Sequence, residues 1–369
     1  MTLRMPELPD LTPGQREAVS LPFESSCLVT GGPGTGKTVT AAYRAAALHA
    51  SGRPTTMLMY SKVLSAYTQA AVARLCAADI VTTYHKWFYD FWRTCYGKNP
   101  PTIRRWEIDW MACLAQVVGQ PPPRQEPRYL VIDEGQDLPK EFYLVLRSIE
   151  PHLTVFADEN QRITASQSTI REITTHAGIK SVTSLSRNSR NTRPVADLAN
   201  HFHPAGGSDI STLTEGPLPR LARHDQRTEA AEHIARHERE HPAETVGVIL
   251  HQANDLWSFR RLLDRRTANS VQGYVSGRRT GPMGDPALTG PGIKLITAKS
   301  AKGLEFDTVF LPELQSVSGD PTTDDTRMQM YVLVTRSRRN LTLMYTGTGE
   351  PALIASLPKR LLDLSVPVT

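Results

Sequence analysis

A glycine-rich segment at residues 31–38 constrains the fold of this chain more than any other feature. Its sequence, GGPGTGKT, follows the apolar run CLVT and precedes the alanine-rich run TVTAAYRAAAL. A strand, a glycine loop and a helix in this order form a phosphate loop, because glycines let main-chain N–H groups approach phosphate oxygens and the helix N-terminus adds positive potential. The segment therefore predicts an α/β fold that presents a nucleotide at the edge of a parallel sheet.

Lys37 and Thr38, at the end of the phosphate loop, carry the chemistry of such a site. The Lys37 ammonium is expected to reach the β- and γ-phosphates of ATP, and the Thr38 hydroxyl to bind Mg²⁺. The other loop positions act through main-chain N–H groups. We expect these positions to be Gly32, Gly34, Thr35 and Gly36.

A second apolar run, YLVID at residues 129–133, ends in the acidic pair Asp133 and Glu134. In an ATP site, Asp133 can hold Mg²⁺ through water, and Glu134 can orient or deprotonate the attacking water. An apolar run that ends in Asp-Glu is also common where a strand meets solvent. The acidic pair therefore supports an ATP site only in combination with Lys37. Phosphoryl transfer also needs positive charge at the γ-phosphate, so we expect an arginine from the second half of the chain.

Short β-rich runs alternate with helical stretches along the chain, which is the pattern of parallel strands joined by helical crossovers. With 369 residues the chain is long enough for two α/β domains, which we place at residues 1–180 and 181–369. The run at residues 181–186 then starts the second domain. Residues 89–127, aromatic and then proline-rich, are expected to form a small insertion, and residues 268–291, rich in Gly, Pro, Ser and Arg, a mobile loop.

The composition, with 40% hydrophobic and 21% charged residues, is that of a soluble globular protein. No apolar run approaches the length that spans a bilayer, and the N-terminus lacks a basic region followed by an apolar stretch, so we expect a cytoplasmic protein without membrane contact. Four cysteines without a CxxC pair indicate reduced thiols. A net charge of +5 is compatible with a polyanionic partner but is weak evidence by itself.

The residues after Asp133 narrow the class of protein. Residues 133–137, DEGQD, resemble the DE-x-QD motif of superfamily 1 helicases of the UvrD/Rep/PcrA type, and the other motifs of that family follow in order from Gln15 to about Arg338. The resemblance implies two RecA-like P-loop NTPase lobes, each a mostly parallel sheet flanked by helices, with ATP in the cleft between them. It also assigns Gln15 to the recognition of adenine.

Further motifs of the family nominate residues around the γ-phosphate. By resemblance, Gln161 senses the γ-phosphate and links hydrolysis to the path of the strand. Gly303 and Glu305 lie near the ribose and the γ-phosphate. Arg190 and Arg336 act as arginine fingers, and the alternative for Arg336 is a surface guanidinium in a basic stretch.

Four residues are candidates for contact with a single-stranded nucleic acid. Tyr60, Thr83 and His85 occupy segments that contact the strand in the family, and Lys299 stands where relatives commonly have His. For the first three, ordinary packing is an equal alternative. ATP that draws the lobes together, followed by hydrolysis that releases them, would move the chain stepwise along a strand.

The chain departs from the family in ways that bear on its activity. The intervals between its motifs leave no room for the large accessory subdomains of relatives, which puts unaided duplex unwinding in doubt. Ser189 stands in place of an aromatic that stacks on adenine, and no aromatic follows Gln161 to stack on a base. The grip on the strand is therefore expected to depend on phosphate contacts and on salt.

A cluster of tryptophans within residues 87–110 has two interpretations. Interleaved with basic residues, it could form a stacking platform for single strands. The spacing of four between Trp106 and Trp110 is that of a packed helix face and favours a place in the core for that pair. The cluster comprises Trp87, Trp92, Trp106 and Trp110.

Two functions remain open at this point. The leading hypothesis is an ATP-dependent translocase or helicase on single-stranded DNA, preferred over RNA, with 3′ to 5′ polarity by resemblance, in DNA repair or anti-phage defence. The alternative is an ATP-dependent regulatory or loading subunit that licenses a protein partner such as a nuclease. Both take ATP as substrate and Mg²⁺ as cofactor.

Overall fold

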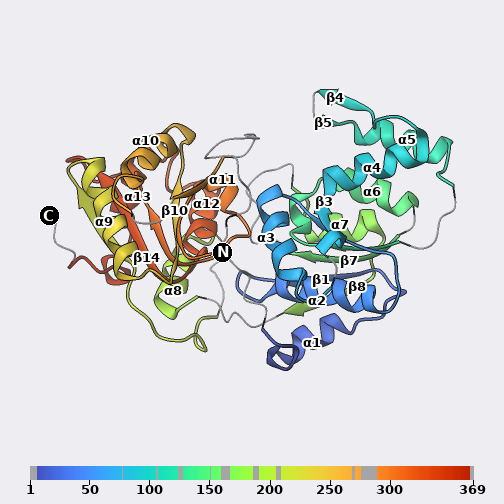
Figure 1. The fold of residues 1–369 in the computed structure, drawn as a ribbon, viewed down its shortest axis with the longest axis horizontal. Coiled ribbons are helices and arrows are strands. Elements are labelled where there is room, and N and C mark those ends of the chain that lie inside the picture. Colours follow the sequence, from blue (N-terminus) through green and yellow to red (C-terminus); the bar gives the residue numbers. More distant parts are fainter. Residues whose placement is uncertain are drawn as a thin grey trace. The chain divides into compact units, whose positions relative to one another are not determined.

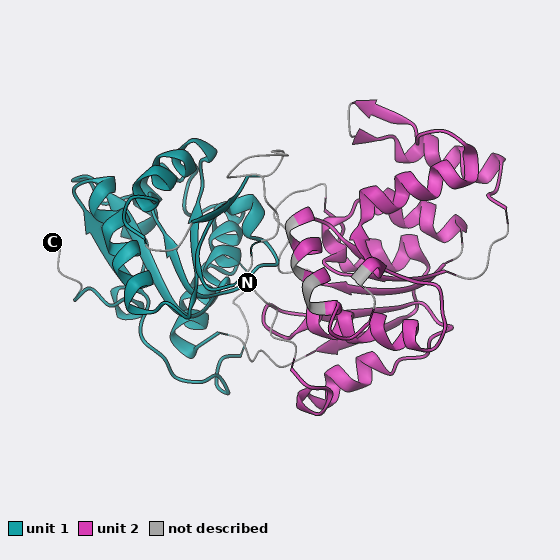
Figure 2. Ribbon diagram, in the orientation of Figure 1, with its two compact units in different colours: residues 1–2, 188–369 teal, residues 3–187 magenta. Residues whose placement is uncertain are grey.

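The computed structural model describes residues 6–76, 78–104, 107–123, 128–149, 151–158, 167–185, 191–204, 209–267, 271–275, 288 and 290–365. The chain divides into two compact units, Leu3–Arg187 and Asn188–Thr369 with Met1–Thr2 (Figure 2). By order along the chain, we call Leu3–Arg187, coloured magenta, the first unit, and Asn188–Thr369, coloured teal, the second unit. Each has its own six-stranded sheet and its own hydrophobic core.

The first unit is built on a sheet with the strand order β3-β2-β6-β7-β1-β8 (Figure 1). All of its neighbouring strands are parallel, so their carboxyl ends lie along one edge. Residues that follow β6, β7 and β1 therefore meet at that edge, where ligands of such sheets bind. The strands are β1 (Cys27–Gly31), β2 (Thr55–Met59), β3 (Val81–Thr83), β6 (Tyr129–Ile132), β7 (His152–Ala157) and β8 (Ser181–Leu185).

Helices flank this sheet, and a small hairpin of β4 (Thr102–Arg104) and β5 (Glu107–Ile108) stands apart from it (Figure 1). The glycine at position 36 precedes the first residue of α2 and has φ 79°, a left-handed conformation that favours glycine. The helices are α1 (Pro13–Val19), α2 (Lys37–Ala50), α3 (Lys62–Val72), α4 (Tyr84–Tyr96), α5 (Trp110–Gly119), α6 (Lys140–Ile149) and α7 (Ile170–Ala177).

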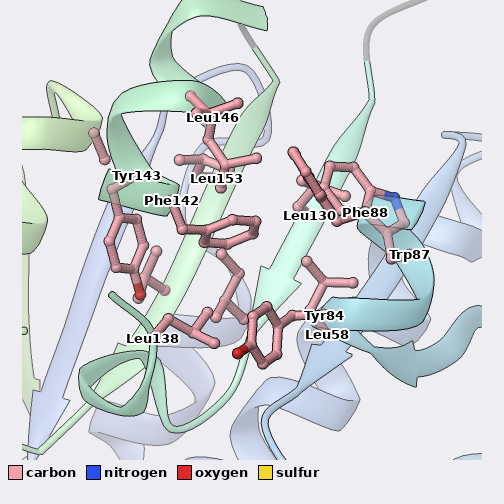
Figure 3. Packing of buried hydrophobic residues seen from close by; sticks show 14 of the residues in the cluster. Leu58, Tyr84, Trp87, Phe88, Leu130, Leu138, Phe142, Tyr143, Leu146 and Leu153 are labelled. Carbon is pink, nitrogen blue, oxygen red and sulfur yellow. The ribbon is translucent and has the colours of Figure 1, made fainter. Parts of the chain in front are cut away.

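The tryptophan cluster belongs to the core of the first unit. Trp87 stacks on Phe91 with ring centroids 5.5 Å apart, and Trp92 is fully buried. Figure 3 shows Trp87 and Phe88 of α4 among the leucines of the sheet and Phe142 of α6. Trp110 packs on Phe142 with centroids 5.3 Å apart. Packing is therefore the role of these three tryptophans, and Trp106 lies outside the described residues.

The second unit repeats the architecture with the strand order β11-β12-β10-β13-β14-β9, again all parallel. The central strands are buried along their length, as expected of a parallel sheet covered on both faces. The two sheets confirm the predicted pair of RecA-like α/β units. The strands are β9 (Arg220–His224), β10 (Thr245–Leu250), β11 (Gln272–Tyr274), β12 (Gly292–Thr297), β13 (Phe306–Leu311) and β14 (Ser337–Thr346).

The helices of the second unit pack on this sheet, with α9 and α10 contributing to its core. They are α8 (Arg193–Phe202), α9 (Arg227–Glu240), α10 (Ala253–Leu263), α11 (Ala298–Ala301), α12 (Asp324–Val334) and α13 (Ala352–Ala355). In neither unit do the described residues include a helix long and apolar enough to cross a membrane.

Two strands differ from the sequence-based expectation. We placed residues 181–186 in the second domain, whereas β8 pairs with β1 and ends the first sheet. Within residues 268–291, expected to be a mobile loop, β11 pairs with β12 at the edge of the second sheet. Both are short edge strands, and β8 carries mostly exposed side chains, so neither shows the apolar run that marks a buried strand.

Candidate nucleotide-binding site

The phosphate loop joins β1 to α2 at the carboxyl edge of the first sheet. Gly34 and Gly36 adopt left-handed φ values of 81° and 79°. The Thr35 hydroxyl donates to the Gly32 carbonyl over 2.9 Å and holds the loop in a tight turn. The loop therefore has the form expected of a phosphate cradle at a helix N-terminus.

Gln15 lies directly against this loop. Its amide nitrogen donates to the Thr35 carbonyl over 2.9 Å, and its amide oxygen accepts from the Thr12 main-chain N–H over 2.9 Å. The side chain is buried, and a β-carbon added at Gly36 would collide with its amide nitrogen. The residue assigned to adenine is thus packed against the phosphate loop from the start of α1.

Lys37 has its ammonium among three oxygen acceptors. Its Nζ atom donates to the carbonyls of Gly31 and Gly32 over 2.6 and 2.9 Å, and it forms an ion pair of 3.1 Å with Asp158. An ammonium has three N–H donors, so these contacts use all of them. Asp158 directly follows β7, the strand next to β1, and both side chains are buried.

Sequence reasoning missed Asp158, although a signal was present. It is the acidic residue that ends an apolar strand, as Asp133 is, but the position of β7 beside β1 comes from the sheet order. The connection after β1 runs toward β2 in one direction across the sheet, and the connection after β7 runs to β8 in the other direction. The direction of the crossover connections therefore reverses between these two neighbouring strands. Such a switch point is where open parallel sheets bind ligands.

Asp133 follows β6 and is fully buried. Among the described residues, neither of its carboxylate oxygens has a hydrogen-bond partner at ordinary geometry. Burial raises the pKa of Asp133 to about 7, with Glu134 adding to the rise, whereas the nearby Thr38 hydroxyl and Lys37 lower it. Two buried carboxylate oxygens without a well-formed hydrogen bond, close to the Thr38 hydroxyl, match the oxygen ligands that Mg²⁺ prefers.

Glu134 takes the next position in an unusual conformation. Its φ of 53° is left-handed, and it begins the short helix η3 (Gly135–Asp137). The Gln136 amide nitrogen donates to the Glu134 carboxylate over 2.5 Å, and the Gln136 amide oxygen accepts from the Asp158 main-chain N–H over 2.9 Å. The Tyr143 hydroxyl of α6 donates to the Gly135 carbonyl over 2.6 Å and holds this turn in place.

The strand-contact candidates of the first unit lie at the carboxyl ends of β2 and β3. Tyr60 is 46% exposed and stacks on Tyr84, with ring centroids 5.9 Å apart and an interplanar angle of 8°. The Thr83 hydroxyl accepts from the Lys86 N–H and caps α4. Burial lowers the pKa of His85 to about 4, so its imidazole is neutral at pH 7. Tyr60 is the candidate among these three whose ring is presented to solvent.

The second unit holds Arg336 and Glu305, two further nominated residues of the ATP site. Arg336 is 1% exposed, and its guanidinium donates to the carbonyls of Val332 and Leu304 and to the Thr335 hydroxyl over 2.8, 3.2 and 3.2 Å. The surface alternative for Arg336 does not hold, because the residue is buried. Glu305 instead pairs with Arg338 over 3.2 Å.

The structure describes two of the four remaining predicted residues. Gly303 has φ 77° and lies between α11 and β13, where the left-handed turn favours glycine. Lys299 is exposed on α11. Gln161 and Arg190 lie outside the described residues. The structure thus gathers Gln15, Lys37, Thr38, Asp133 and Glu134 in the first unit.

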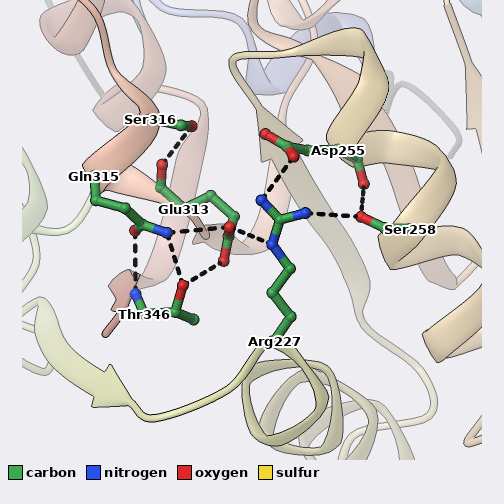
Figure 4. Close-up of polar contacts among 7 residues, drawn as sticks. All are labelled: Arg227, Asp255, Ser258, Glu313, Gln315, Ser316 and Thr346. Atoms are coloured by element: carbon green, nitrogen blue, oxygen red, sulfur yellow. Dashed lines mark hydrogen bonds and ion pairs between the residues drawn. The ribbon is translucent and has the colours of Figure 1, made fainter. Parts of the chain in front are cut away.

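A polar cluster occupies the corresponding edge of the second sheet, and sequence reasoning did not anticipate it. Arg227 forms ion pairs with Glu313 over 2.6 Å and with Asp255 over 2.8 Å. Figure 4 shows Gln315 and Thr346 also bonded to the Glu313 carboxylate. The carboxylates follow β10 and β13, and the chain leaves these strands toward opposite sides of the sheet. This switch point therefore holds one guanidinium and two carboxylates of the unit itself.

The fold and this site define a class: a P-loop nucleotide hydrolase with tandem RecA-like units. Comparisons with family models agree. Residues 15–167 match an AAA domain, and residues 292–344 match the UvrD-like helicase C-terminal domain. The chain belongs to the superfamily 1 UvrD-like helicases, which bind and hydrolyse ATP and bind nucleic acid.

Solved structures give a more distant likeness. The C-terminal domain of a possible DNA helicase from Lactobacillus plantarum is 19% identical, with a TM-score of 0.38, over 49% of this chain and 100% of that one. The helicase of PRRSV is 16% identical, with a TM-score of 0.41, over 90% of this chain. The present chain spans 54% of the length of that helicase. No curated protein matches the sequence.

Proposed function

We propose that the chain is an ATP-driven translocase on single-stranded DNA that moves 3′ to 5′. One observation carries the catalytic part of this proposal: Lys37, Asp133 and Glu134 lie buried at one edge of the first sheet, and the oxygens of Asp133 have no hydrogen-bond partner of ordinary geometry among the described residues. The family membership supports coupling to a nucleic acid. Polarity, the preference for DNA over RNA, and a role in DNA repair or anti-phage defence rest on the resemblance of the motifs.

Within this proposal, the first unit holds Mg-ATP. Thr38 and Asp133 would hold Mg²⁺, which when bound neutralises charge on the β- and γ-phosphates. Lys37 binds the same phosphates, the loop N–H groups of Gly32 to Thr38 cradle them, and Gln15 reads the adenine. Glu134 orients and deprotonates the attacking water.

The second unit supplies positive charge to the γ-phosphate through Arg190 and Arg336, with Gly303 and Glu305 near the ribose and phosphate. Arg336 is bonded to the Val332 and Leu304 carbonyls of its own unit, which would hold its guanidinium in place for this role. Gln161 is proposed to sense the γ-phosphate. Closure of both units on one nucleotide and their release after hydrolysis would drive each step.

The strand is proposed to follow Tyr60, Thr83 and His85 of the first unit and Lys299 of the second. The exposed ring of Tyr60, backed by Tyr84, supports stacking of a base. Lys299 supports a phosphate contact, because it is exposed and charged. Thr83 also caps α4, and the neutral imidazole of His85 adds no positive charge to the path.

Directional displacement of streptavidin tests this proposal. A 3′ to 5′ translocase with ATP should remove streptavidin from a biotin at the 5′ end of single-stranded DNA and leave a 3′-biotin complex intact. The Lys37→Ala variant is the control and should remove neither. Equal displacement from both ends, or displacement from the 3′ end alone, contradicts the proposed polarity.

A second candidate function is an ATP-dependent loading or regulatory subunit for a nuclease. The short intervals between the motifs favour it, because they leave no room for large accessory subdomains. ATP turnover that ignores every nucleic acid but changes with a co-purifying protein would select this function.

A further inference from the structure

A continuous chain of buried contacts links the phosphate loop to the Glu134 carboxylate. The Lys37 ammonium pairs with the Asp158 carboxylate over 3.1 Å. The Asp158 main-chain N–H donates to the Gln136 amide oxygen over 2.9 Å, and the Gln136 amide nitrogen donates to Glu134 over 2.5 Å. All four residues are less than a tenth exposed.

Asp158 and a nucleotide phosphate compete for the same ammonium. Lys37 has three donors, and the carbonyls of Gly31 and Gly32 take two of them. A phosphate oxygen that binds Lys37 must therefore replace Asp158 or a carbonyl of the loop. Asp158 is the acceptor whose negative charge a phosphate would repel, so it is the one expected to leave.

Gln136 is held so that its amide can have one orientation only. Its oxygen faces the Asp158 N–H donor, and its nitrogen faces the Glu134 carboxylate acceptor, so a flip would break both hydrogen bonds. The Gln136 main-chain carbonyl accepts from the Ser168 N–H over 2.9 Å, which anchors the residue from the other side. A shift of Asp158 that moves its main chain would therefore act on the Glu134 carboxylate through one side chain, that of Gln136.

We propose that Asp158 and Gln136 are positioning residues that couple the filling of the phosphate loop to the placement of the Glu134 carboxylate. Asp158 opposes nucleotide binding by holding Lys37, and Gln136 holds the Glu134 carboxylate where it can take a proton from the water that attacks the γ-phosphate. The inference rests on the proposed function only in that Glu134 acts as the base. It requires no nucleic acid and no movement along a strand.

Binding of Mg²⁺ with a non-hydrolysable ATP analogue tests the first half. Asp158→Asn removes the competing charge at nearly constant volume, so the analogue should bind about fivefold more tightly or better, the scale of coupling between linked sites. The charge control is Asp90→Asn, because Asp90 is an exposed residue of α4 that pairs with Lys86. The affinity of this variant for the ATP analogue should stay unchanged. Weaker or equal binding by Asp158→Asn would overturn the competition.

Steady-state turnover without nucleic acid tests the second half. Gln136→Leu should lower kcat by about 10- to 100-fold, the usual cost of losing a group that orients a reacting side chain, with the KM for ATP unchanged. Gln167→Leu is the matched control, because Gln167 bonds to Asp137 rather than to Glu134, and it should retain kcat. A rise in KM with an unchanged kcat would refute the positioning role.

A double variant separates positioning from general damage to the fold. In the Glu134→Gln background, Gln136→Leu should cause no further loss of kcat, because the group that it positions is already inactive. An additive loss would show that Gln136 acts elsewhere. Thermal melting of each variant checks that it is folded. Strand displacement is measured separately, so this inference can fail while the translocase proposal stands.

Discussion

Asp133 and Glu134 are neighbours in sequence, yet their surroundings give them different tasks. Asp133 is fully buried, its oxygens have no hydrogen-bond partner of ordinary geometry among the described residues, and burial raises its pKa to about 7. Glu134 turns away in a left-handed conformation and accepts a hydrogen bond from Gln136. One carboxylate suits a cation and the other suits the activation of water.

The Glu134→Gln variant should bind Mg-ATP normally and stall before hydrolysis. The amide keeps the size of the side chain but cannot accept a proton, so kcat should fall by about 10²- to 10⁴-fold. Nucleotide binding and single-turnover hydrolysis measure the two steps separately. Lys37→Ala is the control that abolishes turnover through loss of phosphate binding. Full activity of Glu134→Gln would remove the base assignment.

Lys294 gives the second unit a pH-dependent stability. It lies on β12 with 1% exposure, its ammonium donates to the Pro291 carbonyl, and burial lowers its pKa from 10.5 to about 8. Between those values the unfolded chain binds the proton and the folded chain does not, so stability should rise with pH. The slope from this residue is at most about 1.4 kcal/mol per pH unit.

Chemical denaturation between pH 8 and pH 9.5 measures this effect. Lys294→Met should remove the Lys294 contribution and make the slope smaller. Lys299→Met, at an exposed lysine of α11, should leave the slope as it is. Identical slopes in the wild type and in Lys294→Met would contradict the account.

Sequence reasoning located the residues that a linear motif defines. Lys37, Thr38, Asp133 and Glu134 are set by their spacing from a strand end, so they could be predicted. Gln136 lies in the DEGQD motif and Asp158 ends the next apolar run, but their contacts could not be predicted, because these depend on β7 lying beside β1 and on the turn that follows β6. The burial of Arg336 depends likewise on carbonyls from α12 and from Leu304.

At the scale of elements, strands with long apolar runs were predicted and the short edge strands were misplaced. β6 and β10 are buried along most of their length, so their sequences show the pattern of a parallel sheet. β8 has one fully buried residue, and β11 has three residues in all. Hydrophobic periodicity carries little information about strands of this kind.

Close packing between strands predicts a glycine requirement in the second sheet. A β-carbon at Gly247 of β10 would lie 2.5 Å from the ring of Phe306 of β13, which is fully buried. Gly247→Ala should therefore cost about 1–3 kcal/mol of stability through overpacking, seen as a lower Tm. Gly119→Ala, with nothing within 4 Å of the added carbon, should leave Tm nearly unchanged.

Combining Gly247→Ala with Phe306→Leu tests whether the Phe306 ring causes the loss of stability. If the ring is the obstacle, Phe306→Leu should make Gly247→Ala less costly than it is in the wild-type background. Equal costs of Gly247→Ala in both backgrounds would show that the packing between β10 and β13 is not the reason.

At the scale of the whole molecule, the proposed cycle needs a charge from the second unit. Arg336→Lys keeps a cation but loses the planar fork of donors, so kcat should fall by about 10³-fold, the lower range for an arginine finger. Because Arg336 also bonds to three acceptors in its own unit, Tm should fall as well.

ATP-analogue affinity distinguishes the two roles of Arg336. A catalytic arginine predicts a normal affinity with a low kcat at a temperature well below Tm. Normal turnover there, with only a lower Tm, would make Arg336 a structural residue and leave Arg190 as the proposed finger.

The central claim is that hydrolysis in the first unit is coupled to a nucleic acid strand. The most direct measurement is the rate of ATP turnover with no nucleic acid, with single-stranded DNA, with duplex DNA and with RNA, each at low and high salt. The account predicts a many-fold rise with single-stranded DNA that weakens as salt increases, and no turnover by Lys37→Ala. Equal turnover in the presence and absence of every nucleic acid would contradict it.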